Sequence, residues 1–399
     1  MKKILLVPLK IIRNFFLLLF IVLAGFYVMA PVYEFSGPSQ FSGDKLYNPY
    51  QNIDSSNWKR YNFQVQSRAW GGITSGSTNS NELIDSIYKR LHFDYVATSD
   101  YQKINRHGSK LDKYIPTYEH GYNAFKTHQV CIDAKKVVWT DFIFFQTLSM
   151  KQYIIDLLSK NSTIVALAHP TLRNGYKLED MKYLTNYNMI EALTNMRVSM
   201  EHWDVALSSG NPVWVLGDDD AHDVLNSNEV GRRFTIINSP SLKKEDIIKS
   251  MLYGSSYAFD LYRHDDEDME VKFKRAKDIP FLKSALMYGD TLKIEVNNEA
   301  AYFNFVGQNG KVLQTNKNTK AANYIIQNND TYVRTKITFP DSSSIYLNPV
   351  IRFSGEKPVS KLSAKIDSRA TTGLRIIYFL IALTAVYFYV KRKQNKQKR

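Results

Sequence analysis

The sequence predicts an α/β barrel followed by a small antiparallel β-sandwich, with a membrane-spanning helix near each end of the chain. Short apolar runs alternate with helical patterns over residues 58–265, which is typical of an α/β barrel. Over residues 266–362, short alternating runs are separated by Asn, Gly and Asp turns, which is typical of a β-sandwich. The apolar stretches near the two ends complete the predicted order.

The first apolar stretch, residues 14–30, carries no charge and follows four basic residues. It is long enough to cross a bilayer, and basic residues favour the cytoplasmic side, so the N-terminus is expected there. A cleaved signal peptide is the alternative. Because Pro31 would follow the cleavage point and disfavours cleavage, we expect an uncleaved anchor over residues 1–31.

The second apolar stretch, residues 374–390, is short for a span but precedes a basic tail over residues 391–399. The same charge rule places this tail in the cytoplasm, so we expect the main domain on the extracytoplasmic side. Eleven Lys and Arg residues flank the two stretches and account for most of the net charge of +14. The charge therefore indicates a membrane partner, and no nucleic-acid partner is expected.

Between these stretches, residues 32–57 are rich in Ser, Gly, Pro and Asn and predict a linker. The one cysteine, Cys131, excludes an internal disulfide and is expected to be a buried core thiol. Period-2 patterns and buried apolar runs predict strands at residues 61–66, 95–98, 124–132, 163–168, 189–193, 213–216, 234–237, 292–296, 301–306 and 332–337. Apolar residues at helical spacing predict helices at residues 80–91, where Ser80 is the cap, and at 150–158, 203–207 and 247–252.

Polar and ionisable residues follow many of these strands. The densest group is residues 217–223, where four carboxylates and a histidine follow a buried strand. Such groups are costly to desolvate and are usually kept where they bind metal or transfer protons, although a solvated acidic turn is the alternative. Pooling the strand ends gives Gln64, Gln66, Asp100, Tyr101, Glu119, His128, His169, Asp220 and His222.

The order of these strand ends resembles the polymerase and histidinol phosphatase (PHP) superfamily over roughly residues 60–260. The motifs that carry the resemblance read Asn-x-Gln-x-Gln, Thr-Ser-Asp-Tyr, Ile-Pro-x-x-Glu, His, His-Pro and Asp-Ala-His-Asp. The resemblance implies a distorted (β/α)7 barrel that holds up to three divalent metals and hydrolyses phosphate esters.

This chain departs from the family pattern at several metal ligands. Gln64 and Gln66 replace the first pair of histidines, Tyr101 replaces another, and residues 68–73 contain no histidine. Neither a glutamine amide nor a phenol replaces a neutral imidazole as a ligand. By the resemblance, one metal position keeps Glu119 and Asp220, a second keeps His222, and a third keeps its full set.

That full set is Glu119, His128 and His169, a common catalytic zinc arrangement with an open fourth position. We expect a divalent metal, zinc or manganese, with fewer than three ions bound. The predicted metal ligands are Glu119, His128, His169, Asp220 and His222. The predicted catalytic residues are Asp220, His222 and Asp100, and the candidates for holding a substrate phosphate are Arg173, Arg197 and Arg232. Glu191 is assigned no role beyond support of a ligand. His120 is expected to be a surface or structural residue, with entry into the site, next to Glu119, as the alternative.

These observations predict a membrane-anchored, extracytoplasmic, metal-dependent phosphoesterase with a reduced metal site. Its substrate would be a phosphorylated small molecule or an envelope component. The alternative is a catalytically inactive pseudoenzyme that binds an envelope ligand or protein partner through the old site. A purely structural protein anchored at both ends is a third hypothesis.

Overall fold

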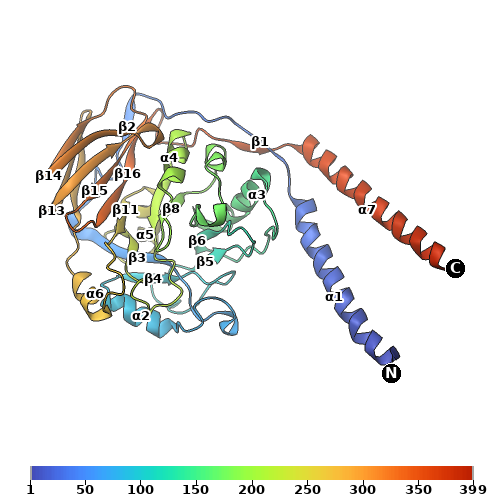
Figure 1. The fold of residues 1–399 in the computed structure, drawn as a ribbon. Coiled ribbons are helices and arrows are strands. Elements are labelled where there is room, and N and C mark those ends of the chain that lie inside the picture. Colours follow the sequence, from blue (N-terminus) through green and yellow to red (C-terminus); the bar gives the residue numbers. More distant parts are fainter. Residues whose placement is uncertain (1, 398–399) are drawn as a thin grey trace.

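The computed structural model describes residues 2–397. Met1 of the predicted anchor and residues 398–399 of the predicted basic tail therefore lie outside the described residues. The strands form a ten-stranded sheet, a five-stranded sheet and a short two-stranded ribbon. Figure 1 shows the two large sheets packed together, with one long helix at each end of the chain extending away from them.

The ten-stranded sheet is antiparallel except at the pair of β3 and β4. Its path runs through β12 (Leu282–Tyr288), β13 (Thr291–Val306), β15 (Tyr332–Thr338), β16 (Ser344–Phe353), β11 (Ser256–Asp260), β10 (Arg233–Asn238), β3 (Trp58–Val65) and β4 (Tyr95–Thr98), while β14 (Val312–Ile325) pairs with β13 and β2 (Lys45–Tyr47) with β16. The C-terminal strands are antiparallel, but they continue this sheet through β11 instead of forming two sheets of their own. One apolar core lies along this junction and contains Phe234, Phe259 and Phe303.

The five-stranded sheet delivers most of the candidate site residues. It consists of β5 (Thr117–His120), β6 (Gln129–Ala134), β7 (Ser162–Leu167), β8 (Met189–Leu193) and β9 (Trp214–Gly217). The first three strands are antiparallel and the last three are parallel. Cys131 in β6 is fully buried, and burial raises the pKa of its thiol to about 12, as expected of a core residue.

The predicted barrel is not formed as a closed sheet; the protein is a mixed α/β structure. Among residues 2–397, the backbone bridges between the two large sheets are isolated ones, Val65 with Ala221 and Tyr101 with Glu119. The reason lies in β3, whose first half is paired antiparallel with β10 from Trp58 to Tyr61. That edge of β3 is therefore already occupied. The bridge to Val65, the last residue of β3, is made by Ala221, which lies four residues beyond the end of β9.

Five helices lie between the end helices: α2 (Asn81–Arg90), α3 (Leu148–Ser159), α4 (Met200–Ser208), α5 (Lys244–Leu252) and α6 (Met269–Arg275). The first four match predicted helices, and α6 was not predicted. Ser80 caps α2 by accepting a hydrogen bond from the Leu83 amide at 3.1 Å. Short 3₁₀ turns occur at Ser55–Asn57, Trp70–Gly72, Leu172–Asn174, Glu179–Lys182 and Gln308–Gly310.

The end helices are α1 (Lys2–Met29) and α7 (Ser368–Gln397). Within them, Lys10–Met29 and Ser368–Asn395 are long and apolar enough to cross a membrane, and neither is buried against the rest of the protein. A ribbon of β1 (Tyr33–Phe35) and β17 (Ala364–Ile366) joins the segments beside them. The side of the membrane on which each end lies stays a prediction.

The segment predicted as a linker contributes to the folded body. Within residues 32–57, β2 pairs with β16, and Phe41 and Tyr50 are buried. The ten-stranded sheet joins strands from both sides of residue 265. The predicted domain boundaries stay predictions.

A buried ion pair ties α4 to β15. Asp204 accepts hydrogen bonds from Arg334 Nε and Nη2, both at 2.7 Å, and both side chains are nearly buried. We expect Arg334→Leu to lower the free energy of unfolding by about 3–5 kcal/mol, because it leaves the Asp204 carboxylate buried and unpaired. Denaturant unfolding of the full-length protein in detergent measures this. The exposed pair of Arg263 and Asp265 is the control, since Arg263→Leu should cost less than about 1 kcal/mol.

Candidate metal site

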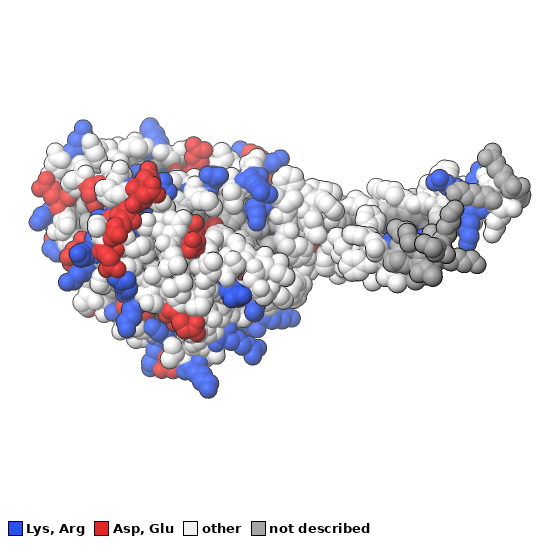
Figure 2. All heavy atoms as spheres, turned by 60° about the horizontal axis from the view of Figure 1, so that its bottom comes forward, with Lys and Arg blue, Asp and Glu red and all other residues white. Residues whose placement is uncertain are grey.

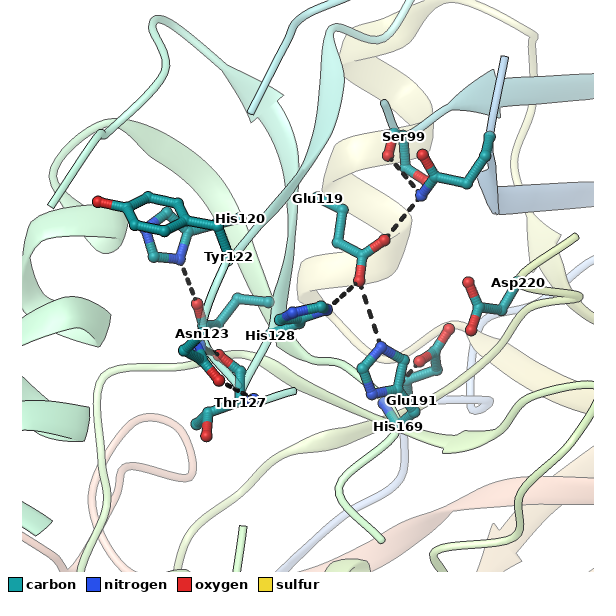
Figure 3. A network of polar contacts seen from close by, with 12 residues as sticks. Ser99, Glu119, His120, Tyr122, Asn123, Thr127, His128, His169, Glu191 and Asp220 are labelled. Atoms are coloured by element: carbon teal, nitrogen blue, oxygen red, sulfur yellow. Dashed lines mark hydrogen bonds and ion pairs between the residues drawn. The ribbon is translucent and has the colours of Figure 1, made fainter. Parts of the chain in front are cut away.

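Three side chains meet where β5, β6 and β7 come together (Figure 3). Glu119 lies in β5, His128 directly precedes β6, and His169 follows β7 by two residues. Because both strand pairs are antiparallel, the end of β5, the start of β6 and the end of β7 lie side by side. The topology thus collects residues that are 50 positions apart in the sequence.

The three side chains are buried and in direct contact. Glu119 Oε1 accepts hydrogen bonds from His128 Nδ1 at 2.6 Å and from His169 Nε2 at 3.2 Å. Their candidate ligand atoms all lie within 4.8 Å of one another. A tetrahedral ion with ligands at about 2.1 Å separates neighbouring ligand atoms by about 3.4 Å, so this group is close to the required size.

The backbone around the site is strained in places. His169 has a φ of 30° and Asp220 a φ of 50°, both in the left-handed region that residues other than glycine rarely adopt. Such strain costs on the order of 1–3 kcal/mol and clusters at functional sites. Gly121 has a φ of 130°, and a Cβ atom there would lie 2.3 Å from His128 Cδ2. A glycine at this position is therefore needed to leave room for the imidazole.

Two further side chains hold the candidate ligands in place. Gln66 Nε2 donates to Glu119 Oε2 at 2.7 Å and to the Ser99 carbonyl at 2.9 Å. Glu191 Oε2 accepts from the His169 amide at 2.7 Å. The sequence showed Gln66 only as a replacement for a histidine of the family pattern, because a contact across 53 positions leaves no local signal.

Charge interactions keep Glu119 ionised. Burial raises the pKa of Glu119, but the adjacent His128 and His169 outweigh this effect and hold it below its ordinary value. Burial lowers the pKa of His128 despite the nearby carboxylate. Burial also acts to lower the pKa of His169, but Glu119 and Asp220 raise it above its ordinary value. The Glu119 carboxylate and a neutral His128 are in the protonation state that metal ligands require, whereas the raised pKa of His169 favours its charged form, whose proton a bound ion would displace.

Three further buried carboxyl groups lie beside this group. Burial raises the pKa of Asp220 to about 6 and raises those of Glu191 and Asp218 well above their ordinary values. One carboxylate oxygen of each, together with His128 Nε2 and His169 Nδ1, is buried with no hydrogen-bond partner among the described residues. Buried unpaired acceptors and excess carboxylates are what a bound cation would satisfy, so the residues present fit a divalent metal ion.

Asp219 has a different role from its neighbours. It is fully buried and accepts hydrogen bonds from the Tyr88 hydroxyl at 2.8 Å and from three backbone amides. These amides belong to Gly231 at 2.6 Å, Arg232 at 2.8 Å and Arg233 at 2.9 Å. Asp219 therefore fastens the start of β10 to the end of β9, and sequence reasoning gave it no role.

Other predicted site residues lie outside the group of three. Asp100 is occupied by hydrogen bonds from the Ser67 amide at 2.8 Å and from Asn105 Nδ2 at 3.1 Å, which favours a structural role. His222 is half-buried, and its Nδ1 pairs with the Asp220 carbonyl at 2.8 Å. The ring nitrogens of His120 are taken by Gln129 and by the carbonyl of Thr140, so His120 points away from the site (Figure 3).

The three arginines that were predicted to bind a substrate phosphate differ in their exposure and in their contacts. Arg173 and Arg197 are exposed and donate to the backbone carbonyls of Ala124 and Met196. Arg232 is held by the carbonyl of Asn195 at 2.6 Å and faces Asp260 at 3.7 Å. A cation that sequence reasoning missed lies nearer the candidate ligands. The half-buried Lys126 has its Nζ 5.5 Å from the centre of the Tyr101 ring, and its charge acts on both His128 and Asp220.

Comparison with known proteins adds one similar structure. No family model and no curated protein matches the chain. A two-domain protein from Bacteroides vulgatus ATCC 8482, described as containing a predicted PHP-like metal-dependent phosphoesterase, aligns over 77% of this chain and 100% of its own at 12% identity, with a TM-score of 0.40. The site is therefore interpreted from its own geometry.

Proposed function

We propose that the protein is a membrane-anchored, extracytoplasmic hydrolase of phosphate esters that works with one divalent metal ion, zinc or manganese. The buried group of Glu119, His128 and His169 carries this proposal. A metal ion held there would act as a Lewis acid on a phosphoryl oxygen and supply an activated water near neutral pH. The motif order that resembles the PHP superfamily supports the same reaction class.

The protein's own residues have separate tasks in this proposal. Asp220, with one buried unpaired oxygen beside the group, is placed to accept a proton. Lys126, whose charge acts on His128 and Asp220, would attract a phosphate anion. Gln66 and Glu191 orient Glu119 and His169 through the hydrogen bonds described above. His222 would help to fix the backbone at Asp220, whose carbonyl pairs with its ring, and Asp100 would help to fix the backbone at Ser67.

A pseudoenzyme is the second candidate, favoured by one observation. Gln66, which stands where the resemblance expects a histidine, uses its amide nitrogen to hold Glu119 and Ser99. A site fixed by such contacts can bind an envelope ligand or a protein partner through one ion without the two-metal clamp that many phosphoesterases use. This candidate predicts bound metal without turnover.

The test uses full-length protein in detergent and two soluble substrates, bis(p-nitrophenyl) phosphate and p-nitrophenyl phosphate. We expect turnover that disappears after treatment with a chelator and returns on addition of zinc or manganese. Turnover that survives complete removal of metal would contradict the proposal. Bound metal with no turnover of either substrate would favour the pseudoenzyme.

A further inference from the structure

Six aromatic side chains are exposed on loops near the candidate metal site. We call them the aromatic surface: Trp70, Tyr122, Phe125, Trp139, Phe144 and Phe145. Their exposed fractions range from 37% for Tyr122 to 60% for Phe144. Soluble proteins rarely expose a continuous apolar patch without a partner, whereas aromatic residues are enriched where proteins meet the lipid headgroups.

Contacts between the loops show that these residues form one surface. The rings of Trp70 and Trp139 lie 6.1 Å apart, and the Tyr122 hydroxyl donates to the Trp139 carbonyl at 2.7 Å. The Ala124 amide donates to the Ile143 carbonyl at 2.9 Å, which places the backbone beside Phe125 next to the backbone beside Phe144. Three loops that are separate in the sequence are thereby joined.

The same surface contacts the end of α1. Tyr27, in the last turn of α1, accepts hydrogen bonds at its hydroxyl from the amides of Phe144 at 3.0 Å and Phe145 at 3.3 Å. Its ring lies 4.9 Å from that of Phe145. Figure 1 shows α1 leaving the body on the side of α3, β5 and β6, and Figure 2 shows a largely uncharged area where the body meets the end helices. A bilayer that surrounds α1 would therefore begin at these loops.

The aromatic surface is also the rim of the candidate metal site. Trp70 Nε1 donates to the Tyr101 carbonyl at 2.8 Å, and the ring of Tyr101 lies 5.7 Å from that of His128. Tyr122 follows Glu119 by three residues, and Phe125 directly precedes Lys126. One continuous set of contacts thus connects α1, the aromatic surface and the candidate ligands.

We propose that the aromatic surface inserts into the headgroup region of the bilayer and that the substrate is the phosphate ester of a membrane lipid, reached from the bilayer itself. The substrate class rests on the proposed function. The membrane contact rests on the aromatic surface and its attachment to α1.

Tryptophan fluorescence tests the membrane contact without any activity. The protein has five tryptophans, and Trp58, Trp203 and Trp214 are buried or half-buried in the body. In nanodiscs of phosphatidylcholine with brominated acyl chains, we expect quenching that is largely lost in Trp70→Phe/Trp139→Phe and retained in the control Trp58→Phe/Trp214→Phe. Quenching that is unchanged without Trp70 and Trp139 would overturn the contact.

A pair of substrates tests the substrate class. Phosphatidic acid in phosphatidylcholine nanodiscs is compared with soluble p-nitrophenyl phosphate, using Phe125→Asp/Phe144→Asp. We expect lipid turnover to fall by about tenfold or more relative to soluble turnover, because two charged side chains cannot enter the headgroup region as phenyl rings do. The control Tyr288→Asp/Ile325→Asp changes two exposed apolar residues of β12 and β14 and should leave the ratio unchanged.

The outcomes separate this inference from the proposed function. Equal loss on both substrates, or no lipid turnover by a wild-type protein that hydrolyses the soluble ester, would overturn the lipid substrate while leaving the hydrolase. No turnover of either ester would overturn the hydrolase and the substrate class with it. The quenching result then decides the membrane contact by itself.

Discussion

Replacing His169 with alanine is expected to lower turnover of the soluble phosphodiester by more than about 100-fold, since even residues that only orient a metal ligand contribute about 10–100-fold. His169 Nε2 lies 3.2 Å from Glu119 Oε1, within the buried group that fits a metal ion. Its removal leaves two protein ligands where a stable catalytic site uses three. Steady-state kinetics at saturating zinc or manganese, with circular dichroism as the folding check, measures the effect.

The matched control is His264→Ala, which removes an exposed histidine outside the site. It should leave both turnover and bound metal unchanged. Wild-type turnover in a folded His169→Ala protein would show that hydrolysis occurs elsewhere, and the proposed site would have to be abandoned.

The second large effect is on stability, and it comes from Asp219. Alanine at this position would leave three backbone amides and the Tyr88 hydroxyl buried without their acceptor. An unsatisfied buried donor costs about 1–3 kcal/mol, so Asp219→Ala should lower the free energy of unfolding by about 5 kcal/mol or more. We expect most of the variant to be unfolded or degraded, as assessed by denaturant unfolding and by yield of folded protein.

Asp265→Ala is the control for this change, because Asp265 is an exposed carboxylate whose loss should cost less than about 0.5 kcal/mol. An Asp219→Ala protein with wild-type stability would mean that the hydrogen bonds to Asp219 do not hold β10 to β9. The acidic stretch would then be free to act as a metal site, as its sequence first indicates.

The secondary structure was largely predictable, but its assembly was not. Apolar periodicity located β4, β8 and α2 because each is a short local pattern with clear ends. The pairing of β3 with β10 and the continuation of the sheet from β11 into β16 depend on contacts across the whole chain. These two pairings open the expected barrel and draw the C-terminal strands into the main sheet.

The residues of the candidate site likewise divide into those that the sequence predicted and those that it did not. Glu119, His128 and His169 were identified by motif order, which a family resemblance can carry through a divergent sequence. The support from Gln66 and the position of Lys126 were not identified, because hydrogen bonds and charge interactions between distant residues leave no spacing to detect. The structural role of Asp219 was not identified either, because its hydrogen bonds to Tyr88 and to the amides at the start of β10 join residues that are distant in the sequence.

The most direct test of the central claim is the amount of metal bound per chain. Full-length protein purified in detergent, supplied with zinc and manganese and then freed of loose ions, is analysed by mass spectrometry of its metals. We predict about one divalent ion per chain in the wild-type protein, in line with three protein ligands at one site, and a marked loss in His128→Ala. Wild-type protein that is folded but retains neither metal would contradict the claim that Glu119, His128 and His169 form a metal site.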